Sequence, residues 1–293
     1  MAGPFPEALW ASADGYEPYI GRWSRLVARG FLAWLEVGTR ARWLDVGCGT
    51  GALTATILAA ADPSSVLGID PSAGYVAHAA SKTDDRRAGF AVGDAEALPV
   101  PDSAFDAAVS GLVLNFIPDP TRAMVEACRV VRAGGTVGAY VWDYAGEMQL
   151  IRVFWNAATR LDATAAPFDE GRRFQICRPD ALRALYEGAG LHGVEVEAID
   201  VPTHFADFDD YWQPFLGGQG PAPAYAMSLL PAHRTALRGA GRTALTTRLS
   251  SSVMRIFGLA TWFSVGRMRS RLSYLQPQES QTWAGVLDHD ARK

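Results

Sequence analysis

The sequence predicts an α/β fold in which helices cover both faces of a parallel sheet. Short apolar segments alternate with segments of helical periodicity from about residue 40 to about residue 200, a pattern typical of parallel strands joined by helices. The apolar segments are continuous, as in strands buried on both faces. Polar residues end four of them, namely Asp45, Asp70, Asp94 and Ser110. Ligands bind beyond the carboxyl ends of such strands, so these four residues predict a site.

The expected elements follow one another along the chain. A helix is expected over 19–36, with apolar residues at helical spacing. Five strands are expected over 42–46, 66–70, 89–94, 105–110 and 136–142. Two helices are expected to begin at Ala52 and after Pro71. A third helix is expected over 121–131 and is expected to end at residues 132–135.

Beyond the fifth strand the pattern becomes looser. We expect helices over 148–161 and 179–188, a loop over 165–177, and a half-exposed strand over 194–199. Residues 205–220 are aromatic and expected to be helical. Two interpretations stay open for their aromatic side chains, which either line an apolar pocket or form part of the core. These residues are Phe208, Tyr211, Trp212 and Phe215.

Composition narrows the class of protein. The chain has 293 residues, 49% of them apolar and 20% charged, as in an ordinary globular protein. Its net charge of −4 produces no field that attracts nucleic acid. The three cysteines are far apart in the sequence, which predicts no disulfide framework and no metal site. Neither a signal peptide nor a membrane span is apparent, so we expect a cytoplasmic protein.

A glycine loop follows the first expected strand and precedes a helix. It reads Leu44-Asp45-Val46-Gly47-Cys48-Gly49-Thr50-Gly51, and glycines there let a ligand approach the backbone. The glycines also fit the dinucleotide pattern, in which such a loop holds a pyrophosphate. Asp45 separates the two interpretations, because a carboxylate repels pyrophosphate and attracts an ammonium or sulfonium group. The loop therefore favours a cationic ligand that resembles an amino acid.

Two further acids predict an adenosine beside that loop. Asp70 follows Gly51 by about 20 residues, the spacing at which an acid at the end of the second strand accepts hydrogen bonds from ribose hydroxyls. Asp94 ends the third strand, where it is placed to accept from an adenine amino group, and Ala95 offers its backbone N–H to the ring.

Together these segments resemble the class I S-adenosylmethionine-dependent methyltransferases, specifically the small-molecule branch that includes the ubiquinone/menaquinone-biosynthesis C-methyltransferases. The resemblance covers roughly residues 16–145 and rests on four motifs in order, at 44–51, 68–72, 93–106 and 129–135. It implies a Rossmann-like three-layer sandwich whose seven-stranded sheet is mostly parallel, with the last strand antiparallel. It also implies S-adenosylmethionine as cofactor and methyl transfer to oxygen, carbon or nitrogen of a small-molecule acceptor.

The resemblance also assigns roles to individual residues. The methionine portion is expected to contact Asp45 and the loop backbone, the ribose Asp70, and the adenine Asp94 and Ala95. Ser110 is expected near the sulfonium, Arg22 at the methionine carboxylate, and Tyr19, like Tyr16, at the wall of the acceptor pocket. The full set of expected cofactor-binding residues is Arg22, Asp45, Gly47, Gly49, Gly51, Asp70, Pro71, Asp94, Ala95 and Ser110.

Methyl transfer from a sulfonium is an in-line displacement, so positioning supplies most of the acceleration. A general base is needed only for an acceptor whose proton has a high pKa. By position Asp143, after the fifth strand, is the best candidate base, and an N-cap for the next helix is the alternative. Asn115 either faces the acceptor or caps a turn. With Tyr19, these are the candidate catalytic residues.

The chain is expected to divide into a helical N-terminal lid over 1–40, the cofactor-binding domain with an acceptor-side insertion over 41–242, and a divergent basic tail over 243–293. The tail holds six arginines, and its residues 256–265 are the candidate for the last strand. Residues 276–293 are expected to be disordered. Two other functions stay open, an NAD(P)-dependent oxidoreductase and a non-catalytic cofactor-binding module.

Overall fold

The computed structural model describes residues 22–217, 220–248 and 257–268 of the chain. Predictions for Tyr16 and Tyr19, and the expected disorder of 276–293, lie outside these ranges. The side chain of Arg22 is also outside the description, although its backbone begins the first described helix.

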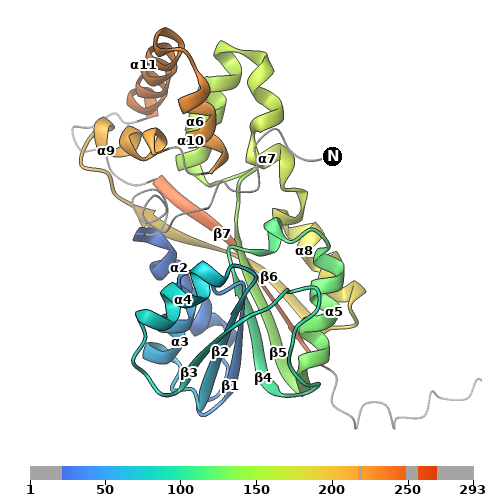
Figure 1. Cartoon of the computed structure of the whole chain (residues 1–293). Coiled ribbons are helices and arrows are strands. Elements are labelled where there is room, and N and C mark those ends of the chain that lie inside the picture. The colour runs from blue at the N-terminus through green and yellow to red at the C-terminus, as the bar shows by residue number, and fades with distance from the viewer. Residues whose placement is uncertain (1–21, 218–219, 249–256, 269–293) are drawn as a thin grey trace, which may run out of the picture.

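A seven-stranded sheet in the order β3-β2-β1-β4-β5-β7-β6 forms the centre of the molecule (Figure 1). Strands β1 to β5 run parallel, and β7 pairs antiparallel with both β5 and β6. The predicted fold, with its antiparallel last strand, is therefore confirmed. The strands are β1 Arg42–Val46, β2 Ser65–Asp70, β3 Ala88–Val92, β4 Phe105–Gly111, β5 Val131–Trp142, β6 His192–Thr203 and β7 Phe257–Arg267.

Helices cover both faces of the sheet, as Figure 1 shows. On one side lie α2 (Arg22–Leu35), α3 (Ala52–Ala60) and α4 (Ala73–Ser81), and on the other α5 (Pro120–Val130) and α8 (Pro179–Gly188). The apolar stripe of α2 is buried, and its Phe31 ring lies 4.9 Å from that of Tyr140 in β5. Gly138 permits this packing, since a Cβ there would lie 2.8 Å from Leu35 Cδ2.

A second helical lobe lies above the sheet in Figure 1. Phe154 is buried at its centre, and its ring stacks on Phe215 at 4.6 Å. Phe208, Tyr211 and Trp212 pack in the same aromatic cluster. These side chains therefore form a core and do not line an apolar pocket. The helices of the lobe are α6 Gln149–Leu161, η4 Ala163–Phe168, α7 Glu170–Arg173, η5 Gln175–Cys177, α9 Phe208–Trp212, η6 Gln213–Leu216, α10 Pro221–Ser228 and α11 Pro231–Arg248.

Three local expectations differ from the structure. The expected loop over 165–177 contains α7 and two 3₁₀ turns, because Asp162 and Asp169 cap successive short helices. Residues 132–135 do not form a stop, since α5 passes directly into β5 at Val131. The strand expected over 194–199 is longer, since β6 spans His192–Thr203. In contrast, the candidate last strand over 256–265 is found as β7, between β5 and β6.

No helix within the described ranges combines the length and the apolar character needed to cross a membrane.

Candidate functional site

The glycine loop joins β1 to α3 through three residues with positive φ. Gly47, Gly49 and Gly51 have φ values of 73°, 51° and 87°, a region that side chains rarely adopt. Gly47 is also required for space, since a Cβ there would lie 2.4 Å from Val113 Cγ1. The loop backbone therefore packs against the segment after β4.

The Asp45 carboxylate is fully buried beside the loop. Its Oδ2 accepts a hydrogen bond from the Thr54 hydroxyl at 2.7 Å, whereas its buried Oδ1 has no hydrogen-bond partner among the residues that the structure describes. Burial raises the pKa of Asp45 to about 7, and the charge of Asp70 adds to that rise. A buried acceptor without a partner costs free energy, so this atom fits a cationic donor such as an ammonium group.

Asp70 connects the end of β2 to the glycine loop. Its Oδ2 accepts from the Gly49 amide at 2.9 Å, and its Oδ1 accepts from the Ser72 amide at 2.9 Å. Asp94 lies after β3, is exposed, and accepts from the Glu96 amide at 2.9 Å. Each carboxylate oxygen retains a free lone pair for a ligand.

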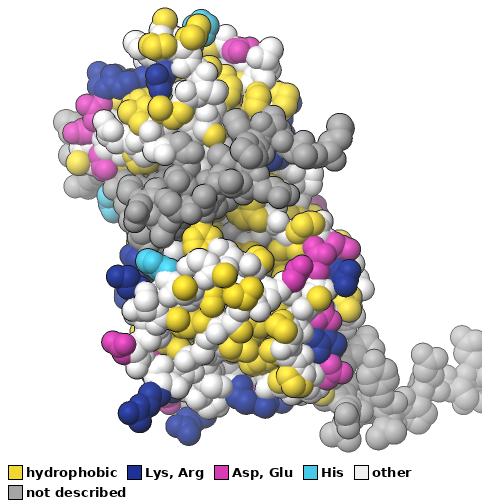
Figure 2. All heavy atoms as spheres, viewed as in Figure 1, with side chains coloured by type: hydrophobic (Ala, Val, Ile, Leu, Met, Phe, Trp, Pro, Cys, Tyr) yellow, Lys and Arg dark blue, Asp and Glu magenta, His cyan; other side chains and the backbone are white. Residues whose placement is uncertain are grey.

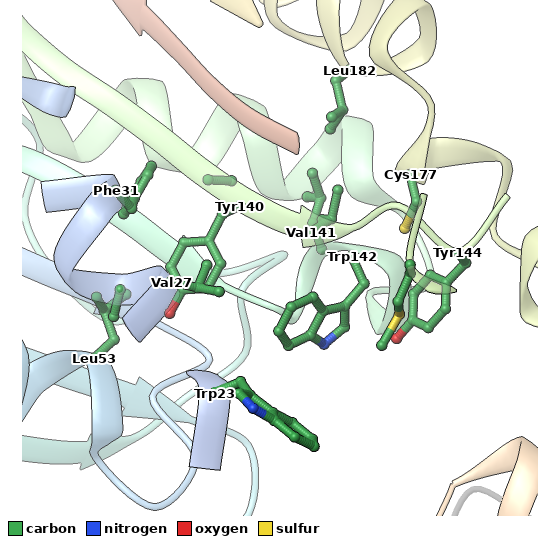
Figure 3. Close-up of a cluster of buried hydrophobic side chains, with 14 of the residues drawn as sticks. Trp23, Val27, Phe31, Leu53, Tyr140, Val141, Trp142, Tyr144, Cys177 and Leu182 are labelled. Atoms are coloured by element: carbon green, nitrogen blue, oxygen red, sulfur yellow. The ribbon is translucent and has the colours of Figure 1, made fainter. Parts of the chain in front are cut away.

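A cavity of about 330 Å³ opens where β1 to β5 end. Its acidic side carries Asp45, Asp70 and Asp94, with the backbone of the glycine loop. The opposite side is aromatic, with Phe116, Tyr140, Trp142 and Tyr144. Figure 3 shows Tyr140, Trp142 and Tyr144 in sequence along β5 and just beyond it. The cavity thus has a negative end for a cation and an apolar end for a second molecule.

The structure brings most of the expected cofactor-binding residues to this cavity. Asp45, Gly47, Gly49, Asp70, Pro71, Asp94 and Ala95 all line it. Gly51 belongs to the loop but is turned away, because it caps α3 and a Cβ there would meet Ala79. For Arg22 only the backbone is described, and Tyr19 lies outside the description.

Ser110 does not line this cavity. Its buried Oγ has no hydrogen-bond partner in the described part of the chain, and the residue lines a separate pocket of about 30 Å³ with Tyr186. Gly111, the next residue of β4, lines the main cavity instead. Successive strand residues face opposite sides of a sheet. The residue of β4 that faces the cavity is therefore the one after Ser110, and the expectation for Ser110 was wrong by one position.

The two candidate catalytic residues in the described ranges are also outside the cavity lining. The Asp143 carboxylate is buried and accepts from the amides of Gly146 at 2.9 Å and Glu147 at 2.8 Å. It therefore stabilises the turn before α6, whereas the N-cap position of α6 is Met148, so Asp143 is not the N-cap that was the alternative. Asn115 lies in a 3₁₀ turn (η3, Leu114–Phe116), and no described residue accepts a hydrogen bond from its buried Nδ2.

Sequence reasoning missed the aromatic side of the cavity. Attention to the period of two along β5 points to Tyr140 and Trp142, which share one face of the strand and line the cavity. The residues after β4 carry a weaker signal, since Val113, Phe116 and Ile117 resemble ordinary core residues.

Comparisons with known proteins find methyltransferases among the relatives of this chain. Residues 44–138 match the family model described as a methyltransferase domain. The malonyl-[acyl-carrier protein] O-methyltransferase of Methylococcus capsulatus is 33% identical over 167 residues, which are 53% of this chain and 60% of that protein. The ubiquinone/menaquinone biosynthesis C-methyltransferase UbiE of Methylobacterium nodulans is 39% identical over 164 residues, 51% of this chain and 65% of that protein. The chain thus spans less than two thirds of these relatives.

Solved structures show the same fold at low sequence identity. The YcgJ protein of Bacillus subtilis aligns with a TM-score of 0.55 and 18% identity, over 84% of this chain and 99% of that one. A putative methyltransferase from an antibiotic biosynthesis pathway of Anabaena variabilis aligns with a TM-score of 0.57 and 16% identity, over 83% and 97%.

Proposed function

We propose that this chain, whose residues 44–138 belong to the methyltransferase domain family, transfers a methyl group from S-adenosylmethionine to a small-molecule acceptor. The observation that carries the proposal is the buried Oδ1 of Asp45, which has no partner within the described ranges, in a residue that lines the cavity beside the glycine loop. The α-ammonium group of the donor fits that atom.

The other expected contacts extend from this position along the acidic side. The backbone of Gly47 and Gly49 lies next to Asp45, where it fits the methionine portion of the donor. Asp70 is placed for the ribose hydroxyls, and Asp94 with Ala95 for the adenine. A pyrophosphate at the same loop would meet the charges of Asp45 and Asp70. This arrangement supports S-adenosylmethionine over a dinucleotide.

The aromatic side is the proposed acceptor site. S-adenosylmethionine supplies an activated methyl group on a sulfonium, so the protein has to hold the acceptor in line with it. Phe116, Trp142 and Tyr144 offer flat apolar surfaces for a partly apolar acceptor. The named relatives act on malonyl-[acyl-carrier protein] or in ubiquinone and menaquinone synthesis, and an acceptor of comparable kind is proposed here.

We further propose that residues 1–40 form a lid, and that the protein is cytoplasmic and does not bind nucleic acid. The face in Figure 2 supports the last point, because its basic and acidic side chains form small separate groups with hydrophobic side chains between them.

A metabolite panel incubated with methyl-labelled S-adenosylmethionine and analysed by mass spectrometry tests the proposal. Wild-type protein is expected to label at least one small molecule, and Asp45→Asn to abolish the labelling. The control Asp84→Asn changes an exposed acid far from the cavity lining and is expected to retain it. Labelling that persists in Asp45→Asn would contradict the proposal.

A further inference from the structure

Tyr140 and Gly111 form one stretch of the cavity wall. They are paired neighbours on the parallel strands β5 and β4, and both line the cavity. Gly111 has no side chain, and a Cβ there would lie 2.5 Å from the Oη of Tyr140. The phenol oxygen of Tyr140 therefore occupies the place beside β4 that the side chain of another residue would take.

The ring of Tyr140 reaches from the aromatic side of the cavity toward the side proposed for the donor. In Figure 3 it projects from β5 toward the helices that carry Val27 and Leu53. Leu53 belongs to α3, the helix that follows the glycine loop, and it lines the cavity. Packing against Phe31 holds the ring in place, since the two ring centroids are 4.9 Å apart and both residues are buried.

The residue after Gly111 has a strained backbone. Leu112 lines the cavity with a φ of 61°, in the left-handed region that a bulky side chain rarely adopts. Its amide donates to the Tyr140 carbonyl at 2.8 Å, so the strained turn is tied to the strand that carries the phenol. Backbone strain of this kind recurs at ligand sites, where the surrounding structure maintains it. The strain is thus a second indication that a ligand lies against the end of β4.

The proposed donor contacts lead to this part of the wall. In S-adenosylmethionine the sulfur joins the methionine chain to the ribose, so it has to lie between the groups proposed to contact Asp45 and Asp70. Its methyl group has to face the acceptor. Asp45 belongs to β1, and β4 and β5 follow β1 in the sheet order. Gly111 and Tyr140 therefore lie between Asp45 and the rings proposed for the acceptor.

A sulfonium group is recognised differently from an ammonium group. Its positive sulfur is bonded to three carbons, so it has no N–H or O–H to donate. A partly negative oxygen or the face of an aromatic ring attracts such a cation, and a tyrosine offers both. After methyl transfer the sulfur is a neutral thioether, which has no net charge for a phenol to attract.

We propose that Tyr140 distinguishes the sulfonium donor from the thioether product, because its phenol oxygen lies against the sulfonium. The proposal rests on the proposed function and adds to it a residue that positions the methyl group toward the acceptor. The attraction is lost on methyl transfer, so it favours the exchange of S-adenosylhomocysteine for a new molecule of S-adenosylmethionine.

The test is a ratio of two dissociation constants, that of S-adenosylhomocysteine divided by that of S-adenosylmethionine, measured by calorimetry without an acceptor. Tyr140→Phe removes the phenol oxygen and keeps the ring against Phe31. It is expected to lower the ratio by about threefold to tenfold, the effect of one polar contact. The matched control is Tyr211→Phe, which removes a buried hydroxyl that donates to the Leu150 carbonyl at 3.1 Å, outside the cavity lining. The control is expected to keep the wild-type ratio.

Gly111→Ala is a second variant, and it decides the question if Tyr140→Phe does not fold. Its added methyl group would collide with the phenol oxygen, so it is expected to displace that oxygen and to lower the ratio as well. A wild-type protein that binds neither ligand would overturn the proposed function. If the wild type binds both ligands, a ratio that is unchanged in Tyr140→Phe, or that falls equally in Tyr211→Phe, overturns the role of Tyr140 alone.

Discussion

The Asp70 carboxylate accepts a hydrogen bond at 2.9 Å from the backbone amide of Gly49, 21 residues earlier in the chain. The bond ties the end of β2 to the loop after β1 and holds the loop at the mouth of the cavity. A single side chain thus has two tasks, since it shapes the loop and faces the place proposed for the ribose.

Replacing Asp70 is expected to weaken donor binding. Asp70→Ala removes both the loop contact and the proposed ribose contact, and the loss of such a buried acceptor costs about 1–3 kcal/mol. Calorimetry with S-adenosylhomocysteine is expected to show a dissociation constant raised by about 5- to 150-fold. Asp84→Ala, an exposed neighbour in the sequence, serves as control. Unchanged affinity in Asp70→Ala would refute the adenosine placement.

Donor affinity is expected to depend on pH through Asp45. Its pKa of about 7 lies well above the ordinary value of 3.8, so the ionised form that attracts an ammonium group prevails only above about pH 7. Affinity for S-adenosylhomocysteine should therefore rise between pH 5.5 and 8, by up to about tenfold per pH unit below the pKa. Asp45→Asn should remove this dependence. Thr54→Val, which deletes the hydroxyl that donates to Asp45, should move the midpoint to higher pH.

The same raised pKa predicts that the stability of the ligand-free protein falls with rising pH, whereas its donor affinity rises. The folded, ligand-free protein holds the Asp45 proton more tightly than the unfolded chain does. Its free energy of unfolding should therefore fall as pH rises from about 4 through 7 and then level off. Denaturant melts at each pH measure this contribution as the difference between wild type and Asp45→Asn. A wild-type profile that parallels the variant would show that Asp45 ionises normally.

Three glycine-to-alanine substitutions, two in the glycine loop and one outside it, are expected to destabilise the fold to different degrees. Gly47→Ala combines a positive φ with a Cβ 2.4 Å from Val113, whereas Gly49→Ala has the positive φ alone and Gly38→Ala has neither. Strain alone costs about 1–2 kcal/mol. Thermal melts should show the largest loss for Gly47→Ala, a smaller loss for Gly49→Ala and almost none for Gly38→Ala. Adding Val113→Ala to Gly47→Ala should recover part of the loss, and its failure to do so would contradict the packing argument.

Asp143 is expected to act on stability rather than on methyl transfer. Asp143→Ala removes the acceptor of two amides, and leaving partly buried donors without an acceptor costs about 1–3 kcal/mol. The remote cap Asp119, which accepts from the Arg122 amide, offers a matched Asp119→Ala control. Both variants should lower the melting temperature and leave the affinity for S-adenosylhomocysteine and the pH profile of turnover unchanged. A selective loss of turnover in Asp143→Ala would restore it as a base.

Local patterns were enough to predict the parallel half of the sheet and the acidic side of the cavity. Asp45, Asp70 and Asp94 each end an apolar run, so the parallel topology alone brings them to one edge. Ser110 shows the limit of this reasoning, because the position of a residue at a strand end leaves the face of its side chain undecided. To predict the aromatic side, one has to notice that Tyr140 and Trp142, two residues apart, lie on the same face of β5.

The second lobe depends on contacts that no local pattern contains. Arg152 of α6 meets Asp169 and Gly171 at α7 only because α6 and α7 fold back on one another. The sequence places the adjacent Arg172 and Arg173 in what reads as a loop, with nothing to distinguish them. In the structure one is exposed and the other stacks on Phe174. Long-range packing therefore determines which of the two arginines lies over the ring of Phe174.

Calorimetric titration of the wild-type protein with S-adenosylhomocysteine and, separately, with NADH tests the central claim most directly. The account predicts that S-adenosylhomocysteine binds one site per chain, that Asp45→Asn weakens this binding, and that NADH does not bind. Binding of NADH without binding of S-adenosylhomocysteine would contradict it.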